Sequence, residues 1–275
     1  MFTFVITDIY GHRGARGLYP ENTLFGFEKC LENNLTGFEL DVVVSKNHSL
    51  IVSHEPWMSY KYCLHPNDIP ITKNNQKSFN LYQLTTDEIQ KFDCGSKFNP
   101  EFPHQIKKKC FKPTLEELID KFKVYNYEDI EIQIELKSFK EWYGIFQPYP
   151  EVYAELVIDF LKKHNFNKKQ YLIKSFDSKL LNIIHHHFSG CKFGFLIDNN
   201  KSITNNLKRL NFKPDYYNLE QSKMTTEIIT ELKNNNINSI PWTVNSIKDA
   251  QRLEKLGVTA IITDYPNLFT DRFEA

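Results

Sequence analysis

Two carboxylates interrupt an apolar run in the first part of the chain. The segment GFELDVVV, from Gly37 to Val44, reads as a buried strand, yet Glu39 and Asp41 lie within it. Side chains two residues apart point to the same face of a strand, so the two carboxylates are directed together. Burying an unpaired carboxylate costs several kcal/mol, and a second one beside it adds repulsion. The pattern therefore predicts a positively charged partner.

Other groups able to do chemistry lie near the ends of neighbouring apolar runs, namely His12 and Arg13 in GHRG, His54 in SLIVSH, and Glu135 and Lys137 in ELK. Histidine exchanges protons near neutral pH, so two histidines beside carboxylates favour general acid–base catalysis. Three carboxylates supply the oxygen ligands that a hard ion such as Mg2+ or Ca2+ prefers. The alternative is a structural ion-pair network in which Arg13 and Lys137 neutralise the carboxylates, and the residues alone leave it open.

These side chains need a scaffold that brings strand ends together. Short β-type runs alternate with helical patterns from about residue 130 onward, which indicates βαβ units and a parallel sheet. The expected strands are eight in number and cover residues 2–12, 37–44, 130–136, 171–176, 192–198, 215–220, 239–244 and 260–266. Eight such units predict an α/β fold of the (β/α)8 TIM-barrel type, in which functional groups collect at the C-terminal ends of the strands.

One segment departs from this alternation. Residues 55–112 are polar and rich in Asn, Pro and Lys, with only a short helical signal at TTDEIQKFD. A structureless loop of that length is unusual within a compact domain. We therefore expect a small inserted subdomain between the second and third barrel strands of a single domain that covers residues 1–275.

Bulk properties argue against several classes of protein. Lys plus Arg and Asp plus Glu balance at 34 each, so no nucleic-acid partner is expected. No apolar run approaches the roughly 18 residues of a membrane span, so no stable membrane insertion is expected. The N-terminus lacks the features of a signal peptide, which favours a cytoplasmic location, or a periplasmic or secreted one if a leader was trimmed. Composition does not define the oligomeric state.

The cysteines do not indicate a disulfide framework. They are five in number, scattered, and without a C-x-x-C pair. We therefore expect neither a disulfide framework nor a zinc ribbon, and a reducing compartment is the simpler prediction.

Several motifs occur in a specific order between Tyr10 and Pro266: HRG, PENT, E-x-D, a downstream His, and E-x-K. In this set, and in LGVTAIITDYP near the end, the chain resembles the glycerophosphodiester phosphodiesterases. That resemblance implies hydrolysis of a glycerophosphodiester to glycerol 3-phosphate and an alcohol with one divalent cation, Mg2+ or Ca2+. It implies His12 and His54 as the general acid–base pair, Glu39, Asp41 and Glu135 as metal ligands, and Arg13, Lys137, Phe176 and Trp242 as substrate-binding residues. For Phe176 and Trp242, packing within the barrel is an equal alternative.

The chain also departs from the family pattern. Glu55 stands where an Asp usually follows the second histidine, and a Gly-rich stretch after it is absent. The identity of the alcohol is therefore open. Rival functions are a lysophospholipase D or sphingomyelinase D activity on lipids, a phosphatidylinositol phospholipase C-like activity, and metal-dependent phosphodiester binding without turnover. The aromatic residues of EWYGIFQPYPEVY (Glu141 to Tyr153) would then contact a head group or lipid, or pack against the insertion.

Overall fold

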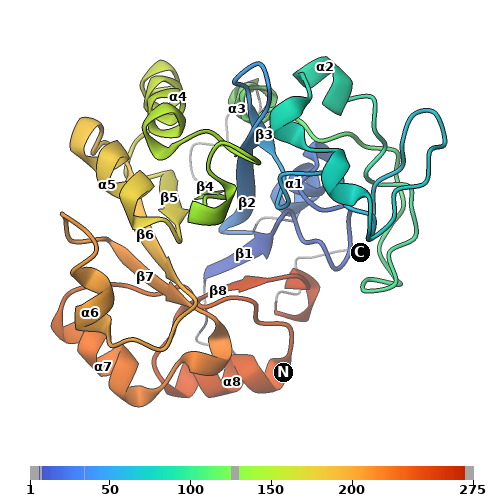
Figure 1. The fold of residues 1–275 in the computed structure, drawn as a ribbon. Helices are drawn as coiled ribbons and strands as arrows, with labels where there is room; N and C mark the ends of the chain where they lie inside the picture. The colour runs from blue at the N-terminus through green and yellow to red at the C-terminus, as the bar shows by residue number, and fades with distance from the viewer. Residues whose placement is uncertain (1–5, 7, 34, 125–129, 270–275) are drawn as a thin grey trace.

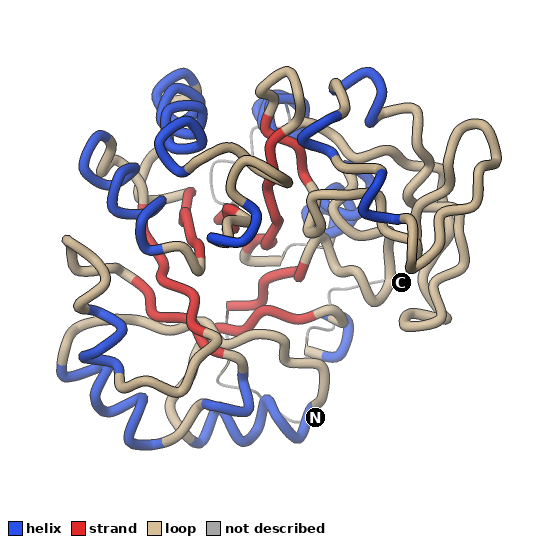
Figure 2. Tube along the Cα trace, in the orientation of Figure 1, coloured by secondary structure: helices blue, strands red, loops and turns tan. Residues whose placement is uncertain are grey.

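The structure is a computed structural model, and it describes residues 6, 8–33, 35–124 and 130–269. Among these residues, seven parallel strands form a curled sheet in the order β7-β6-β5-β4-β2-β1-β8, and a short β3 pairs antiparallel with β2. The strands surround a common centre, with helices outside them and a loop-rich region at the right of the view (Figures 1 and 2). Their bounds are β1 Asp8–His12, β2 Gly37–Val44, β3 Leu50–Val52, β4 Glu131–Leu136, β5 Tyr171–Ser175, β6 Lys192–Ile197, β7 Tyr216–Leu219 and β8 Ala260–Thr263.

The helices mostly follow the strands in chain order and begin at residues suited to capping. Thr23, within PENT, is the N-cap of α1 and accepts a hydrogen bond from the Gly26 N–H (3.1 Å). Among the described residues, no helix combines the length and apolar character that crossing a bilayer requires. The helices are α1 Leu24–Glu32, α2 Thr86–Ile89, α3 Leu115–Val124, α4 Pro150–Lys163, α5 Ser178–His187, α6 Ile203–Leu207, α7 Thr226–Asn234 and α8 Ile247–Lys255.

The predicted barrel strand at residues 239–244 is wrong as a regular strand. This segment lies between β7 and β8. Asn238, just before it, makes an isolated parallel bridge to Tyr216 of β7, and Trp242 within it makes one to Glu220, the residue after β7. On its other side, the Val244 N–H donates to the Ile262 carbonyl (2.9 Å). Toward β7, the Ile240 N–H donates to the Asn218 side-chain oxygen (2.9 Å) in place of a backbone carbonyl, and toward β8, Pro241 has no N–H to donate. Both ladders are therefore interrupted, although the segment still closes the barrel between the two strands. Of the predicted first strand, residues 2–5 and 7 lie outside the described residues.

The segment at residues 55–112 has an apolar cluster of its own. Met58, Leu81 and Ile89 pack there with Val43 and Ile51 of the β2–β3 hairpin. The cluster anchors the segment to the end of β2, at the side of the barrel (Figure 1).

The same cluster contains a disulfide bond between Cys63 and Cys94, so the prediction of no disulfide framework missed this pair. The two cysteines are 31 residues apart in sequence. Spacing rules detect short motifs, whereas this pair is brought together only by the fold of the insertion.

Candidate active site

The three predicted metal ligands lie on neighbouring strands. Phe38, Leu40 and Val42 of β2 pack in the main apolar cluster, so the alternate residues Glu39 and Asp41 face the barrel interior. Asp41 is the register partner of Glu135 on β4. All three carboxylates are buried, and each contributes an oxygen to a group whose atoms lie within 4.8 Å of one another.

Basic side chains also reach these carboxylates. Arg13 Nε is 3.1 Å from Asp41 Oδ2, Lys137 Nζ is 2.5 Å from Glu135 Oε1, and Lys174 Nζ is 3.6 Å from Glu39 Oε1. Burial raises the pKa of Glu39 to about 7 despite the neighbouring Lys174. Burial would also raise the pKa of Asp41, but the nearby cations, Arg13 foremost, outweigh it and hold that pKa below its usual range. The site therefore combines the two alternatives, because ion-paired carboxylates also converge as oxygen donors.

The donor set fits a hard divalent cation. It consists of three buried carboxylates from two adjacent strands, with no sulfur or imidazole among the converging atoms. All-oxygen ligation with room for water or substrate oxygens is what Mg2+ and Ca2+ prefer.

His12, the last residue of β1, is held by the carboxylate of Asp264, the residue that follows β8. Its Nδ1 lies 2.5 Å from Asp264 Oδ1, and Asp264 is itself bound by Arg16 Nε (2.8 Å) and Asn245 Nδ2 (2.7 Å). Burial lowers the pKa of His12 to about 3. A neutral ring that donates from Nδ1 leaves Nε2 free to accept a proton, and Nε2 lies 3.8 Å from Glu39 Oε2.

His54, just beyond β3, has a similar support from the insertion. Its Nδ1 is 3.1 Å from Glu55 Oε1, and the Tyr62 hydroxyl donates to Glu55 Oε2 (2.7 Å). The buried Lys112 ammonium donates to Tyr62 (3.3 Å) and to the Ser53 hydroxyl (2.8 Å). Glu55, which departs from the family pattern, thus orients the histidine beside it.

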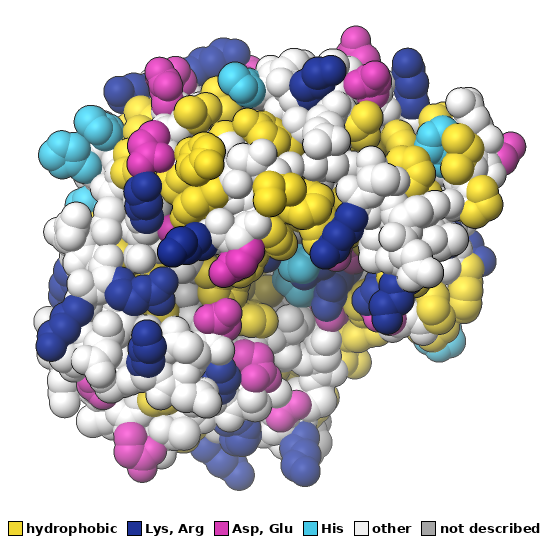
Figure 3. Space-filling model, in the orientation of Figure 1, with side chains coloured by type: hydrophobic (Ala, Val, Ile, Leu, Met, Phe, Trp, Pro, Cys, Tyr) yellow, Lys and Arg dark blue, Asp and Glu magenta, His cyan; other side chains and the backbone are white. Residues whose placement is uncertain are grey.

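One cavity of about 230 Å³ collects these groups at the C-terminal ends of the strands. Every predicted site residue except Asp41 lines it, and Asp41 is covered by contacts with Arg13 and with the Asn22 amide (3.0 Å). A recess with histidine and charged side chains opens on the face drawn in Figure 3. The cavity is lined by His12, Arg13, Arg16, Glu39, His54, Glu135, Lys137, Lys174, Phe176, Leu196, Trp242, Thr243 and Ile262.

Sequence reasoning missed three charged residues of this site: Arg16, Lys174 and Asp264. Lys174 is 1% exposed and lies within the apolar strand β5, where its ammonium also donates to the Gln133 side-chain oxygen Oε1 (3.3 Å). A single lysine in the run YLIKS was the available signal, because an interior lysine needs a charged partner. Asp264 lay within the TDYP motif, but its partner His12 is 252 residues away in sequence.

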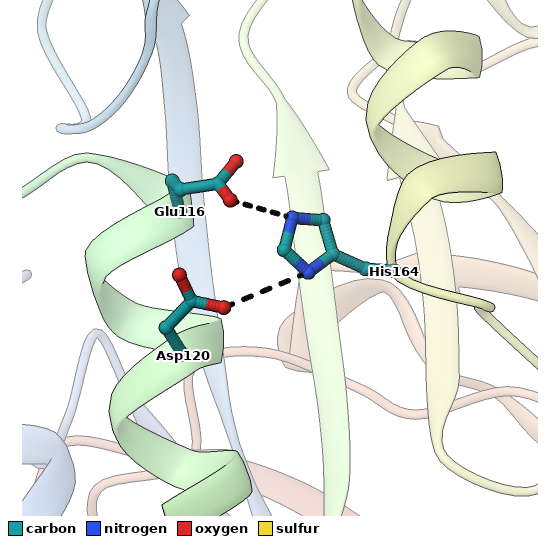
Figure 4. A group of neighbouring side chains, drawn as sticks. All are labelled: Glu116, Asp120 and His164. Atoms are coloured by element: carbon teal, nitrogen blue, oxygen red, sulfur yellow. Dashed lines mark ion pairs between the residues drawn. The ribbon is translucent and has the colours of Figure 1, made fainter.

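A second group of acidic residues and histidine lies in the helical layer and has another role. Glu116 and Asp120 of α3 face His164, the residue that ends α4 (Figure 4). His164 Nε2 is 3.0 Å from Glu116, while Lys163 and Lys123 bring ammonium groups to Glu116 (2.8 Å) and His164 Nδ1 (2.7 Å). These contacts make an ion-pair network that ties α3 to α4.

Comparison with known proteins shows the family of this chain. The sequence profile of the glycerophosphoryl diester phosphodiesterase family matches residues 12–268. The chain belongs to that family. It is 30% identical over 275 residues to a glycerophosphodiester phosphodiesterase of Bacillus subtilis, covering 94% of this chain and 83% of the relative. It is 29% identical over 264 residues to one of Caldanaerobacter subterraneus subsp. tengcongensis, covering 94% and 95%.

Solved structures of the family share the fold. A glycerophosphodiester phosphodiesterase of Thermotoga maritima superposes with a TM-score of 0.67 at 24% identity, covering 98% of both chains. A phosphodiesterase of Oleispira antarctica, in complex with the product sn-glycerol-3-phosphate, gives 0.76 at 20% identity, also covering 98% of both chains. The barrel fold predicted from the sequence is thereby confirmed, and family membership identifies the chain as a phosphoric diester hydrolase that acts on glycerophosphodiesters.

Proposed function

We propose that the cavity hydrolyses a glycerophosphodiester to glycerol 3-phosphate and an alcohol, with one Mg2+ or Ca2+ bound by Glu39, Asp41 and Glu135. The observation that carries this proposal is the convergence of two histidines, each held by its own carboxylate, on the cavity that contains the acidic group. The product bound by the Oleispira relative supports the choice of substrate.

The residues divide the chemistry between charge and proton transfer. A bound divalent cation would supply positive charge for the phosphoryl oxygens. Lys137 and Arg13 add positive charge at the same wall of the cavity, where a phosphodiester anion and the greater charge of its transition state gain stabilisation. Of His12 and His54, one takes the proton of the attacking hydroxyl and the other gives a proton to the leaving alkoxide. Asp264 and Glu55 keep each ring oriented through Nδ1.

Phosphorus NMR of a mixture of glycerophosphodiesters tests this proposal. The mixture contains the choline, ethanolamine, glycerol and inositol esters. It is incubated with the protein in three buffers, which contain Mg2+, Ca2+ or EDTA. We expect a glycerol 3-phosphate signal that grows with metal and is abolished by EDTA. Unchanged spectra under every condition would refute turnover of these esters, and lysophospholipids would then test the lipid activity. Calorimetric binding with an unchanged spectrum would favour the non-catalytic alternative.

A further inference from the structure

An aromatic wall extends from the cavity to its rim, and we name it the aromatic rim. It begins at Phe176, which lines the cavity, and Phe139 stacks on Phe176 with ring centroids 5.9 Å apart. Trp142 follows at 4.5 Å from Phe139, Trp57 at 5.9 Å from Trp142, and Phe146 at 5.3 Å from Trp57. These residues come from the segments after β5, β4 and β3, so three chain connections build one wall. Hydrophobic side chains gather beside the recess in Figure 3.

Cations already lie over the faces of this rim. Lys137 Nζ is 5.7 Å from the ring centre of Phe139 and 5.8 Å from that of Phe176. Farther out, Lys77 Nζ lies 5.1 Å from the ring centre of Trp57 and 6.0 Å from that of Phe146. Ring faces attract cations at such distances. Lys137 is buried and fixed by Glu135, whereas Lys77 is an exposed side chain that an incoming cation could displace.

The rim lies within reach of the phosphate site. Lys137 contacts Glu135, a proposed metal ligand, and two rings of the rim through one ammonium group. An alcohol whose cation is joined to the phosphate oxygen by an ethylene link would therefore meet these rings while its phosphate stays in the cavity.

We propose that the aromatic rim is the subsite for the alcohol and that it takes a quaternary ammonium group, as in a choline ester. This inference rests on the proposed function for its substrate. The methyl groups of such a cation contact the rings, and its charge interacts with their faces, whereas a polyol finds no comparable match in a wall of rings. An acyl chain carries no charge to interact with the ring faces, so a rim that attracts cations gives it no electrostatic preference.

Three esters separate charge from size: glycerophosphocholine, its neutral 3,3-dimethylbutyl isostere, and glycerophosphoglycerol. We expect Trp57→Leu and Trp142→Leu to lower kcat/KM for the choline ester by roughly 2- to 30-fold, and to change the other two esters less. Lys77→Gln removes the competing ammonium without disturbing the interior, so it raises kcat/KM for the choline ester alone. Tyr149→Leu is the matched control, because Tyr149 lies on the same loop, is 60% exposed and is outside the rim.

Equal losses for the choline ester and its neutral isostere, together with no effect of Lys77→Gln, would overturn the subsite. Losses confined to lysophosphatidylcholine would overturn it in favour of an acyl site. Calorimetric titration of the His12→Ala protein with the choline ester and with its neutral isostere repeats the comparison without turnover. A protein that binds the choline ester more tightly than the isostere but hydrolyses no ester would refute the proposed function and support the subsite.

Discussion

The substitution Lys174→Met tests the charge balance of the active site. Lys174 is 1% exposed, its ammonium lies 3.6 Å from Glu39 Oε1, and its other polar contact is Gln133. Methionine keeps much of the side-chain volume but removes the positive charge. Glu39, which is 2% exposed, would then lose the cation closest to that oxygen.

The size of the effect follows from burial. Removing one partner of a buried ion pair costs about 3–5 kcal/mol, and in a chain of this length each kcal/mol lowers Tm by roughly 2–4 °C. We therefore expect Tm of the metal-free variant to fall by roughly 6–20 °C at about pH 8.

The loss should depend on pH. Burial raises the pKa of Glu39 to about 7, above its value of about 4.5 in the unfolded chain. Because the folded protein holds this proton more tightly, metal-free stability falls as pH rises from about 4.5 to about 7. Lys174→Met raises the Glu39 pKa further and extends that fall to higher pH. The difference between variant and wild type is thus smaller near pH ~6, where the carboxyl is protonated, than near pH ~8.

A divalent cation should offset the defect. Ligand at about 100 times Kd stabilises the folded state by about 2.7 kcal/mol, and the variant should bind the cation more tightly because a competing ammonium is gone. Thermal denaturation followed by circular dichroism in EDTA, Mg2+ and Ca2+ at both pH values measures this. Lys179→Met, at an exposed lysine paired with Glu151, is the control and should change stability by less than about 1 kcal/mol. A Lys174→Met protein as stable as the control at the higher pH would refute the charge balance. A Tm that neither metal raises would refute the cation site.

Three further predictions concern the histidines, their support and the insertion. His12→Ala and His54→Ala should each lower kcat at least about 100-fold in the phosphorus NMR assay, with an unchanged far-ultraviolet spectrum, and wild-type rates in either would contradict its assignment. Asp264→Asn should lower kcat by about 100-fold or more and change KM little, because the amide no longer selects the Nδ1–H tautomer of His12. Steady-state kinetics measures the two constants separately. An effect on KM alone would contradict the role of Asp264 in orienting His12. Reduction of the Cys63–Cys94 bond should destabilise the protein by about 2–4 kcal/mol. Dithiothreitol should therefore lower Tm of the wild type but not of a Cys63→Ser/Cys94→Ser protein. If dithiothreitol lowers Tm of both proteins equally, the bond is contradicted.

The sequence predicted those parts of the fold that depend on local periodicity. Alternating apolar runs and helical patterns located seven of the eight expected barrel strands, because each strand's burial is visible in its own residues. The prediction for residues 239–244 failed because the Ile240 N–H donates to the Asn218 side chain and Pro241 has no N–H, and the apolar pattern alone reveals neither. The motifs that supply the site were equally readable, since neighbouring strands of a parallel barrel bring the side chains near their C-terminal ends together.

Contacts between distant segments were not readable. His12 depends on Asp264, and Cys63 on Cys94, across separations of 252 and 31 residues that no local rule connects. The charge of Lys174 was visible, but its inward direction depends on the register of β5 against β4, which the structure defines through the pair Glu135 and Lys174. Local patterns thus predicted which groups line the cavity, and tertiary register determined which groups support them.

The pair of carboxylates on β2 can now be explained by charge compensation from several elements. Arg13 follows β1, Lys137 follows β4 and Lys174 lies on β5, so three cations face the three carboxylates and the group is close to neutral by itself. A divalent cation added to a neutral group leaves the cavity positive, and a phosphodiester anion lowers that excess. In the proposed mechanism, cation and substrate therefore bind more tightly together than separately, with each neutralising the charge that the other introduces. A strand with carboxylates alone would hold the ion without this coupling, which gives the buried lysines a role in function as well as in folding.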